Sequence, residues 1–385
     1  MKKSTCILLF LFTCFYAFSI DWGVLLYNDT SLSANKLSKW NVKQTDYVDF
    51  SLSSVLNTKR SLYISFDGFY EFIFDKTETS VNDLKKNIKN VVDINELAFS
   101  YQTASGRGSA FFISVGRIFM EDLTGLVFSQ SFDGLALKLS NMRADLAVFG
   151  GYTGFLNAHS TTMLVPIDTH YKESENAIYA FSPKYFPCGL SISFPTGREG
   201  QRLDLQVWGI IDANKDEYNR IYGMLGFSGY GGKYCFYDVK TVFGTENIKS
   251  VMNMTLATVK VFLPKAFEIS VSGNYASGKN AVFSPFNGFT SKRDDLVYWA
   301  GEYSGLLKAD LSVEKAFNRF FYGALSGGAV FDCSENISYF GFFANVNSTL
   351  NVFDDLQFNL SVEQFVGKNK EMNKTHISLK AVFEL

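Results

Sequence analysis

Few residues of the sequence have the types and spacing that catalysis requires. His159, His170 and His376 do not form the HExxH spacing of a zinc hydrolase. His376 and Ser378 share one face of an expected strand, as a general base and a nucleophile would, but alternation places polar residues side by side on such a face by default. We therefore expect no catalytic site, no metal site and no cofactor.

Cysteines and glycines give no stronger signal. Cys188, Cys235 and Cys333 are widely spaced in apolar surroundings, so they form neither a disulfide framework nor a zinc spacing. The glycine-rich stretch 226–233 lacks the spacing of a phosphate-binding loop, and we expect it to form a turn.

Charged residues recur at a spacing of two. Lys308 and Asp310 are two residues apart, as are Asp238 and Lys240, and residues two apart lie on one face of a β-strand. The whole chain has a formal net charge of -2 and is 19% charged, which disfavours nucleic acid as a partner because a phosphate-binding face must be basic. With 47% hydrophobic residues, the chain is also too apolar to be disordered.

Alternation of apolar and polar residues dominates the sequence and predicts an all-β protein. In the clearest case, residues 61–74 place Leu62, Ile64 and Phe66 on one face and mixed residues on the other. After the N-terminal segment no apolar run is long enough for a transmembrane helix. We predict strands near residues 22–30, 45–54, 61–75, 92–103, 109–117, 132–140, 143–153, 188–194, 203–212, 217–228, 232–243, 250–263, 266–276, 303–314, 319–332, 337–347, 354–367 and 375–385.

The connections between these strands are expected to alternate in length. Tight turns are predicted at 56–59, 140–143, 264–265 and 353–355, and long loops near 31–44, 76–91, 118–131, 154–187 and 277–302. Apolar spacings of three and four over 81–92 predict a short helix within the second long loop. Short turns at one end and long loops at the other are typical of outer-membrane β-barrels.

These patterns together predict a transmembrane antiparallel β-barrel of about 18 strands, within a range of about 16–18. A closed barrel suits lipid because it leaves no backbone group unpaired. Its outward faces would be apolar, which accounts for the 39 Phe and 20 Tyr spread along the chain. A soluble β-sandwich or propeller is the alternative, but neither needs apolar residues facing outward on nearly every strand.

The two ends of the chain indicate its compartment. Lys2 and Lys3 precede an apolar stretch and a small-residue pattern, which predicts a signal peptide over 1–19 and a single barrel domain over 20–385. Residues 375–385 alternate to the last position, with Phe383 on the apolar face, and resemble the terminal strand that the barrel-assembly machinery recognises. An even strand count would leave both termini in the periplasm.

A family resemblance rests on three short motifs. Residues 114–117 end in Gly-Arg, residues 131–137 open with Ser-Phe-Asp-Gly, and residues 281–286 read Ala-Val-Phe-Ser-Pro-Phe. These segments resemble the alginate-export-type porin barrels, which have a similar number of strands. The resemblance implies passive passage of solute through the barrel.

If the non-lipid faces line a pore, charged residues on them would wet and filter it. We predict that eight residues contribute to this wall: Glu71, Arg117, Asp133, Arg220, Asp238, Lys240, Lys308 and Asp310. Arg117 is an even number of residues from the apolar residues of its strand and so falls on their outward face, by the parity of its position. Either the strand ends there at headgroup level, or Gly116 forms a bulge that turns Arg117 inward, with Asp133 as its partner. Lys308 and Asp310 would either line a constriction or neutralise each other.

Carboxylates outnumber cations on the predicted inward faces, so we expect cations to be favoured and polyanions such as alginate to be repelled. The function this favours is a porin or channel for passive passage of small hydrophilic solutes, with no enzymatic activity. The alternative is a surface-exposed protein that acts through its external loops in adhesion or host interaction, and an outer-membrane hydrolase is less favoured. The expected partners are outer-membrane lipid, the assembly machinery and small solutes.

Overall fold

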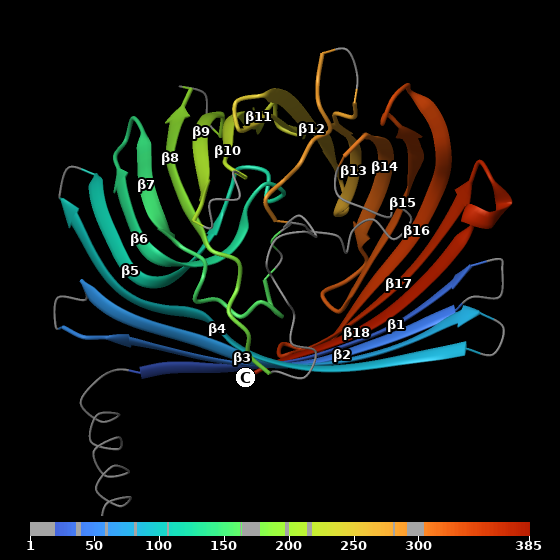
Figure 1. Ribbon diagram of the computed structural model, residues 1–385, viewed down its shortest axis with the longest axis horizontal. Helices are drawn as coiled ribbons and strands as arrows, with labels where there is room; N and C mark the ends of the chain where they lie inside the picture. The colour runs from blue at the N-terminus through green and yellow to red at the C-terminus, as the bar shows by residue number, and fades with distance from the viewer. Residues whose placement is uncertain are drawn as a thin grey trace, which may run out of the picture.

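The alternating residues close into one barrel of antiparallel strands in the computed structural model (Figure 1). The structure describes residues 20–35, 40–57, 61–80, 83–105, 108–161, 163, 178–196, 200–213, 218–279, 282–290 and 304–385. Each strand pairs with the next one along the chain, and the last strand returns to pair with the first. None of the described residues forms a helix long and apolar enough to cross a membrane.

The described residues form 18 strands, and each range predicted from the sequence overlaps one of them. Their bounds are β1 (Ile20–Asn35), β2 (Trp40–Val55), β3 (Leu62–Ser80), β4 (Asp83–Ser105), β5 (Ser109–Glu121), β6 (Ser129–Ser140), β7 (Asp145–Tyr152), β8 (Tyr185–Pro195), β9 (Arg202–Asp212), β10 (Arg220–Tyr230), β11 (Cys235–Glu246), β12 (Ser250–Leu263), β13 (Phe267–Ala276), β14 (Leu306–Ala316), β15 (Phe321–Asp332), β16 (Ser338–Phe353), β17 (Leu356–Gly367) and β18 (Lys374–Glu384). A single 3-10 turn, η2 (Lys370–Met372), separates β17 from β18.

Barrel closure brings the start of β1 beside the end of the chain. The register of β1 and β18 runs from the pair Leu25 and Glu384 to the pair Asn35 and Lys374. The backbone of Val24 and Leu385 exchanges two hydrogen bonds, of 3.1 and 2.9 Å. The same rim of the barrel carries the tight turns, including those that join β6 to β7 and β12 to β13.

Exposure alternates along the strands and separates an outward face from an inward one. On β10, Ile221 and Leu225 are 46% and 45% exposed, whereas Tyr222 and Met224 between them are 0% and 4% exposed. The buried face is the inward one, because Tyr222 and Met224 pack against chain segments that fold into the barrel. The outward face is therefore built mainly of exposed apolar side chains, as the sequence predicts.

Two connections fold inward and fill part of the interior. They are the β5–β6 connection (122–128) and the described part of the β13–β14 connection (277–279, 282–290 and 304–305). Phe128, Phe286 and Phe289 from these segments are at most 1% exposed and belong to one apolar cluster with inward residues of β6 to β13. Figure 1 shows connections crossing the space inside the ring of strands.

Two of the predicted long loops are wrong. Residues 31–44 are mostly strand, since β1 runs to Asn35 and β2 begins at Trp40. Residues 76–80 and 83–91, which include most of the expected helix at 81–92, form the end of the β3–β4 hairpin, with Lys76 opposite Lys86. The reason is that a backbone ladder needs no apolar face, so a polar hairpin pairs without the alternation by which strands are recognised. The predicted loop 118–131 is shorter than expected, and the predicted signal peptide lies outside the described residues.

Candidate functional site

The β5–β6 connection is held in shape by one carboxylate. Asp122 accepts hydrogen bonds from the backbone N–H groups of Thr124, Val127 and Phe128, at 2.6, 2.9 and 2.6 Å, and from the Thr124 hydroxyl at 2.6 Å. Burial raises the pKa of Asp122 above its ordinary value, while these four hydrogen bonds oppose the shift because they stabilise the charged form. Asp122 is not among the site residues predicted from the sequence, although Asp followed two positions later by Thr is a turn signal.

The shaped connection docks on the barrel wall through aromatic rings. Phe128 stacks on Trp208 of β9 with ring centroids 4.7 Å apart, and on Phe289 with centroids 5.7 Å apart. The backbone N–H groups of Phe289 and Thr290 both donate to the carbonyl oxygen of Val127 at 2.9 Å. The two inward-folded connections thus form one body packed against the wall from β6 to β13.

Arg220, the first residue of β10, anchors this body to the barrel wall. Its guanidinium donates to Glu246 Oε2 at 3.1 Å and to the carbonyl oxygen of Gly288 at 3.2 Å. The Tyr222 hydroxyl beside it donates to the carbonyl oxygen of Asn287 at 2.7 Å. Arg220 has the inward parity that the sequence predicts, but it is only 3% exposed. It therefore holds the β13–β14 connection and presents almost no surface to open lumen.

A second charged anchor lies where β4 and β5 separate. These strands pair only between Leu97–Ser105 and Ser109–Arg117, so the rest of β4 has no β5 partner. The β7–β8 connection covers this free edge: the Asn157 amide donates to the carbonyl oxygens of Val92 and Ile178, both at 2.9 Å. The Ser160 hydroxyl in the same connection donates to Asp93 of β4.

Arg117 of β5 connects β4, β6 and the β7–β8 connection at the place where β4 and β5 separate, which we call the seam. Its guanidinium donates to Asp133 at 3.0 and 3.1 Å, to Asp93 at 3.2 Å, and to the carbonyl oxygens of Ile94 and Phe155 at 3.1 and 2.8 Å. Asp133 is the partner that the sequence predicts, but both explanations of why Arg117 falls on the apolar face differ from the structure. The strand does not end there, since β5 runs to Glu121, and the register with β6 passes through Arg117 opposite Asp133 without a shift.

Gly116 allows this arrangement through its backbone rather than through a bulge. Its φ is +129°, which disfavours a side chain, and a Cβ there would lie 2.2 Å from the carbonyl oxygen of Leu97. Because the Arg117 side chain is 11% exposed, the contacts at the seam occupy most of its surface. The paired carboxylate of Asp133 is 28% exposed.

The remaining predicted cations pair with carboxylates on the inward face. Lys240 lies 3.0 Å from Asp238 on β11, and Lys308 lies 3.2 Å from Asp310 on β14. The Lys308 ammonium also lies 4.7 Å from the centre of the Phe343 ring on β16. These neighbours two positions apart neutralise each other, which was one of the two alternatives for Lys308 and Asp310.

Carboxylates without such partners gather on the inward face of β2, β3 and β4. Asp49, Asp67 and Glu96 lie on three neighbouring strands, with Asp67 directly opposite Glu96. Asp49 accepts a hydrogen bond from Tyr47 at 2.9 Å, and Glu96 accepts one from Ser65. Within the described ranges no Lys or Arg is ion-paired with these three groups. Glu71, which the sequence predicts to line the pore, is also inward on β3, opposite Tyr47.

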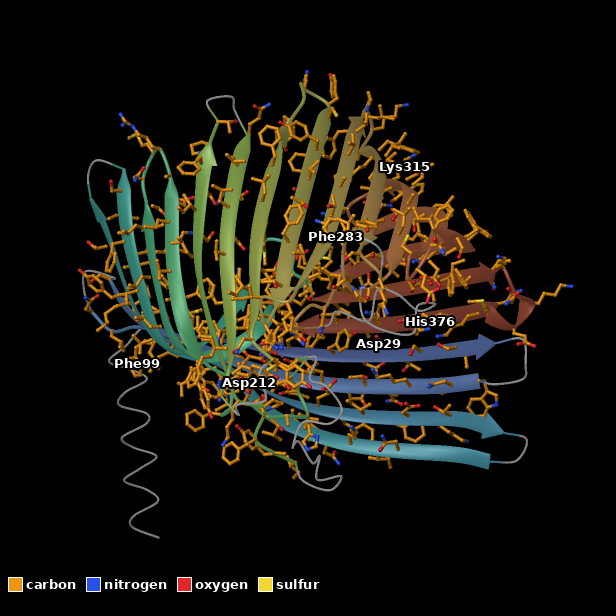
Figure 2. All side chains as sticks on the ribbon, turned by 45° about the horizontal axis from the view of Figure 1, so that its top comes forward. Asp29, Phe99, Asp212, Phe283, Lys315 and His376 are labelled. Carbon is orange, nitrogen blue, oxygen red and sulfur yellow. The ribbon has the colours of Figure 1, made fainter. Side chains whose placement is uncertain are left out.

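The residues considered for catalysis do not form a catalytic pair. His376 Nδ1 contacts the Ser33 hydroxyl at 2.8 Å, and the Ser378 hydroxyl donates to Asp29 at 2.8 Å. His376 and Ser378 of β18 thus contact two different residues of β1. Figure 2 shows Asp29 and His376 on these two neighbouring strands. In the part of the chain that the structure describes, no three His, Cys, Asp or Glu residues are arranged to hold a metal ion.

A closed antiparallel barrel of 18 strands with an apolar outside and a polar, partly filled inside is porin-like in its fold. Its likeness to solved structures agrees. OccK7 (OpdD) of Pseudomonas aeruginosa superposes with a TM-score of 0.65 at 10% identity, over 95% of this chain and 99% of that one. OpdK of the same organism, solved with vanillate, gives 0.62 at 11% identity over 95% and 98% of the two chains. OccAB4 of Acinetobacter baumannii gives 0.59 at 12% identity over 95% and 98%.

The comparisons of sequence give no family. No protein-family model matches the chain, and no curated protein matches its sequence. The expected resemblance to alginate-export-type barrels is therefore unsupported, whereas the coarser prediction of an outer-membrane porin-like barrel fold is confirmed.

Proposed function

We propose that the protein is an outer-membrane channel through which small hydrophilic solutes diffuse passively. The observation that carries this proposal is the closed barrel with exposed apolar side chains outside and paired charges inside. Lipid can cover such an outside without leaving backbone groups unpaired, and water can wet such an inside. The likeness in fold to OccK7 and OpdK supports the same function.

The passage would run beside the inward-folded connections. These connections occupy the side of the lumen formed by β6 to β13, so solute would pass along the opposite wall. That wall includes the carboxylates Asp49, Asp67 and Glu96 of β2, β3 and β4, which favours cations over anions. Membership in the alginate-export-type family, which rests on short motifs alone, would not change this expectation, because a polyanion would be repelled.

Placement in the membrane follows from the asymmetry of the two rims. The rim with the tight turns and both chain ends would face the periplasm, as short turns do in bacterial outer-membrane barrels. The final strand exposes Ile377 and Leu379 outward and would serve as the signal for the barrel-assembly machinery. An epitope inserted after Asn336, between β15 and β16, should then be reachable on intact cells, and one inserted after Met142, between β6 and β7, should not.

The surface-adhesion alternative is less favoured by this geometry. The described parts of the β5–β6 and β13–β14 connections fold into the barrel and bury their aromatic rings there, instead of presenting a surface outside. A connection buried in the lumen restricts passage, which is a property of a channel.

Solute entry into liposomes tests the proposed function. The purified, refolded protein is placed in liposomes, and swelling is followed in isotonic sugars and amino acids of increasing size. A channel predicts rapid swelling with the smallest solutes and a size limit, with no swelling for heat-denatured protein. Folded protein that gives no swelling with any solute would contradict the proposal.

A further inference from the structure

Four polar side chains interrupt the apolar outward face of β1 and β2. They have the strand parity of exposed residues such as Val48, which is 42% exposed and lies two positions from Asp46. They therefore face away from the lumen. We call them the outward polar group, and they are Asn28, Thr30, Gln44 and Asp46.

Hydrogen bonds join the members of this group to one another. The Asn28 amide donates to one carboxylate oxygen of Asp46 at 2.5 Å, and the Gln44 amide donates to the other at 3.0 Å. The Thr30 hydroxyl donates to the side-chain oxygen of Asn28 at 3.4 Å. No cation is ion-paired with Asp46 among the residues that the structure describes. Neutral amides are thus the donors that this carboxylate has within its own chain.

Apolar residues enclose the group on all sides. Along β1, Leu26 and Leu32 flank it and are 41% and 42% exposed. Across the sheet, Ala381 of β18 lies opposite Asn28, and Phe72 of β3 lies opposite Asp46. The group is therefore an island in the face that lipid would cover, and not part of a polar rim.

Two tryptophans place the island between the two edges of this face. Asn28 is six residues after Trp22 and six before Ala34, which pairs with Trp40. The Lys76 ammonium lies 5.3 Å from the centre of the Trp40 ring, and Trp beside a Lys is typical of a membrane interface. A carboxylate midway between two such interfaces would be destabilising if only lipid covered it.

A shallow depression adjoins the island. It has a volume of about 280 Å³ and is lined by Leu26, Asn28, Asp46, Val48, Ala381 and Phe383, with backbone neighbours, at the junction of β18, β1 and β2. The small Ala381 side chain stands among larger apolar residues there. A side chain from a neighbouring molecule would fit into it.

We propose that this face binds a second copy of the chain about a two-fold axis that runs parallel to the barrel axis. The island is self-complementary: each amide of Asn28 and Gln44 has a second N–H, and Asp46 retains unused lone pairs. A two-fold axis brings the donors of one copy to the carboxylate of the other. An acyl chain would fill the depression but would offer no donor to Asp46. The inference rests on the proposed membrane location.

Cysteine cross-linking in native membranes tests the contact. Val48→Cys, made with Cys188→Ser to remove an exposed native thiol, would lie near the axis and should form a disulfide-linked band at twice the monomer mass after oxidation. Val207→Cys is the matched control, because Val207 is outward on β9 and 52% exposed, and it should give no such band. Adding Asp46→Leu and Asn28→Leu to Val48→Cys should abolish the cross-link while the barrel stays heat-modifiable.

Each other outcome overturns the contact. These are no cross-link at Val48→Cys, an equal cross-link at the Val207→Cys control, a cross-link to a different protein, or a cross-link that survives in the folded variant that also carries Asp46→Leu and Asn28→Leu. Bilayer current recorded from the same preparations separates this inference from the proposed function. Current without a dimer refutes only the contact, and a dimer without current refutes only the channel.

Discussion

Replacing Arg220 should release the inward-folded β13–β14 connection and widen the channel. Arg220 donates charge-assisted hydrogen bonds to Glu246 and to the carbonyl oxygen of Gly288 and is 3% exposed. Glu246 belongs to β11 of the wall, so only the bond to Gly288 is lost when the connection is released. A hydrogen bond to a charged group contributes about 1.5–3 kcal/mol, so Arg220→Met removes about 1.5–3 kcal/mol from the docked state. Since every 1.4 kcal/mol is about a tenfold change in an equilibrium constant, even the lower value shifts the ratio of docked to released connection about tenfold.

Two measurements follow the release. Single-channel conductance should rise in Arg220→Met, because the body that occupies one side of the lumen is loosened, and protease should cut within 282–290 in the folded protein. Arg202→Met is the matched control: Arg202 also pairs with carboxylates, but its side chain is 50% exposed, and such surface pairs contribute only about 0–1 kcal/mol. The control should leave both readouts unchanged.

Unchanged conductance and unchanged protease resistance in folded Arg220→Met would show that Arg220 does not hold the connection in the lumen. That result would mean that packing of Phe286 and Phe289 alone keeps the connection in place. The same two readouts in Phe289→Ala would then locate the anchor in the aromatic cluster.

Three further predictions concern the seam, assembly and selectivity. Arg117→Ala leaves Asp93 and Asp133 without their cation and should lower the stability of the folded barrel by about 3–5 kcal/mol, as for other buried pairs. The measurement is the temperature at which the compact electrophoretic form is lost, which should fall. A fall no larger than that of the exposed turn variant Arg143→Ala would contradict the prediction. Phe383→Asp places a charge on the outward face of the closing strand and should reduce the amount of folded barrel in the outer-membrane fraction of cells, whereas Glu384→Gln should not. Normal levels of folded Phe383→Asp barrel in that fraction would show that β18 is not the assembly signal. Asp310→Lys and Glu71→Lys should each shift the reversal potential in the direction that indicates a greater preference for anions. Asp354→Lys in the β16–β17 turn should shift it less. Equal shifts in all three variants would mean that the strand faces do not set the ion selectivity.

The strands could be predicted from the sequence because their signal is local. Alternation such as that of Leu62, Ile64 and Phe66 reports one face against lipid and one against the lumen, and this contrast recurs around the barrel. The signal fails where both faces are polar. The ends of β3 and β4 therefore read as a loop, although Lys76 and Lys86 sit opposite each other in a regular ladder.

The charged residues show what the position of a residue along its strand can and cannot predict. Parity places Lys308 and Asp310 on one inward face, and they do pair there. Parity does not reveal which inward residues a connection will cover, because Gly288 and Arg220 are far apart in the chain and meet only through the fold. For the same reason, no local pattern predicts that Asn157 covers the free edge of β4.

Current through single molecules in a planar lipid bilayer tests the channel most directly. With a salt gradient across the bilayer, the protein should carry stepwise, passive current with a reversal potential that favours cations, most strongly at low salt, where the Debye length approaches about 30 Å. Folded protein that inserts into the bilayer but carries no current would show that the barrel is not a channel. Anion selectivity in the unmodified protein would show that the inward carboxylates of β2, β3 and β4 do not line the path.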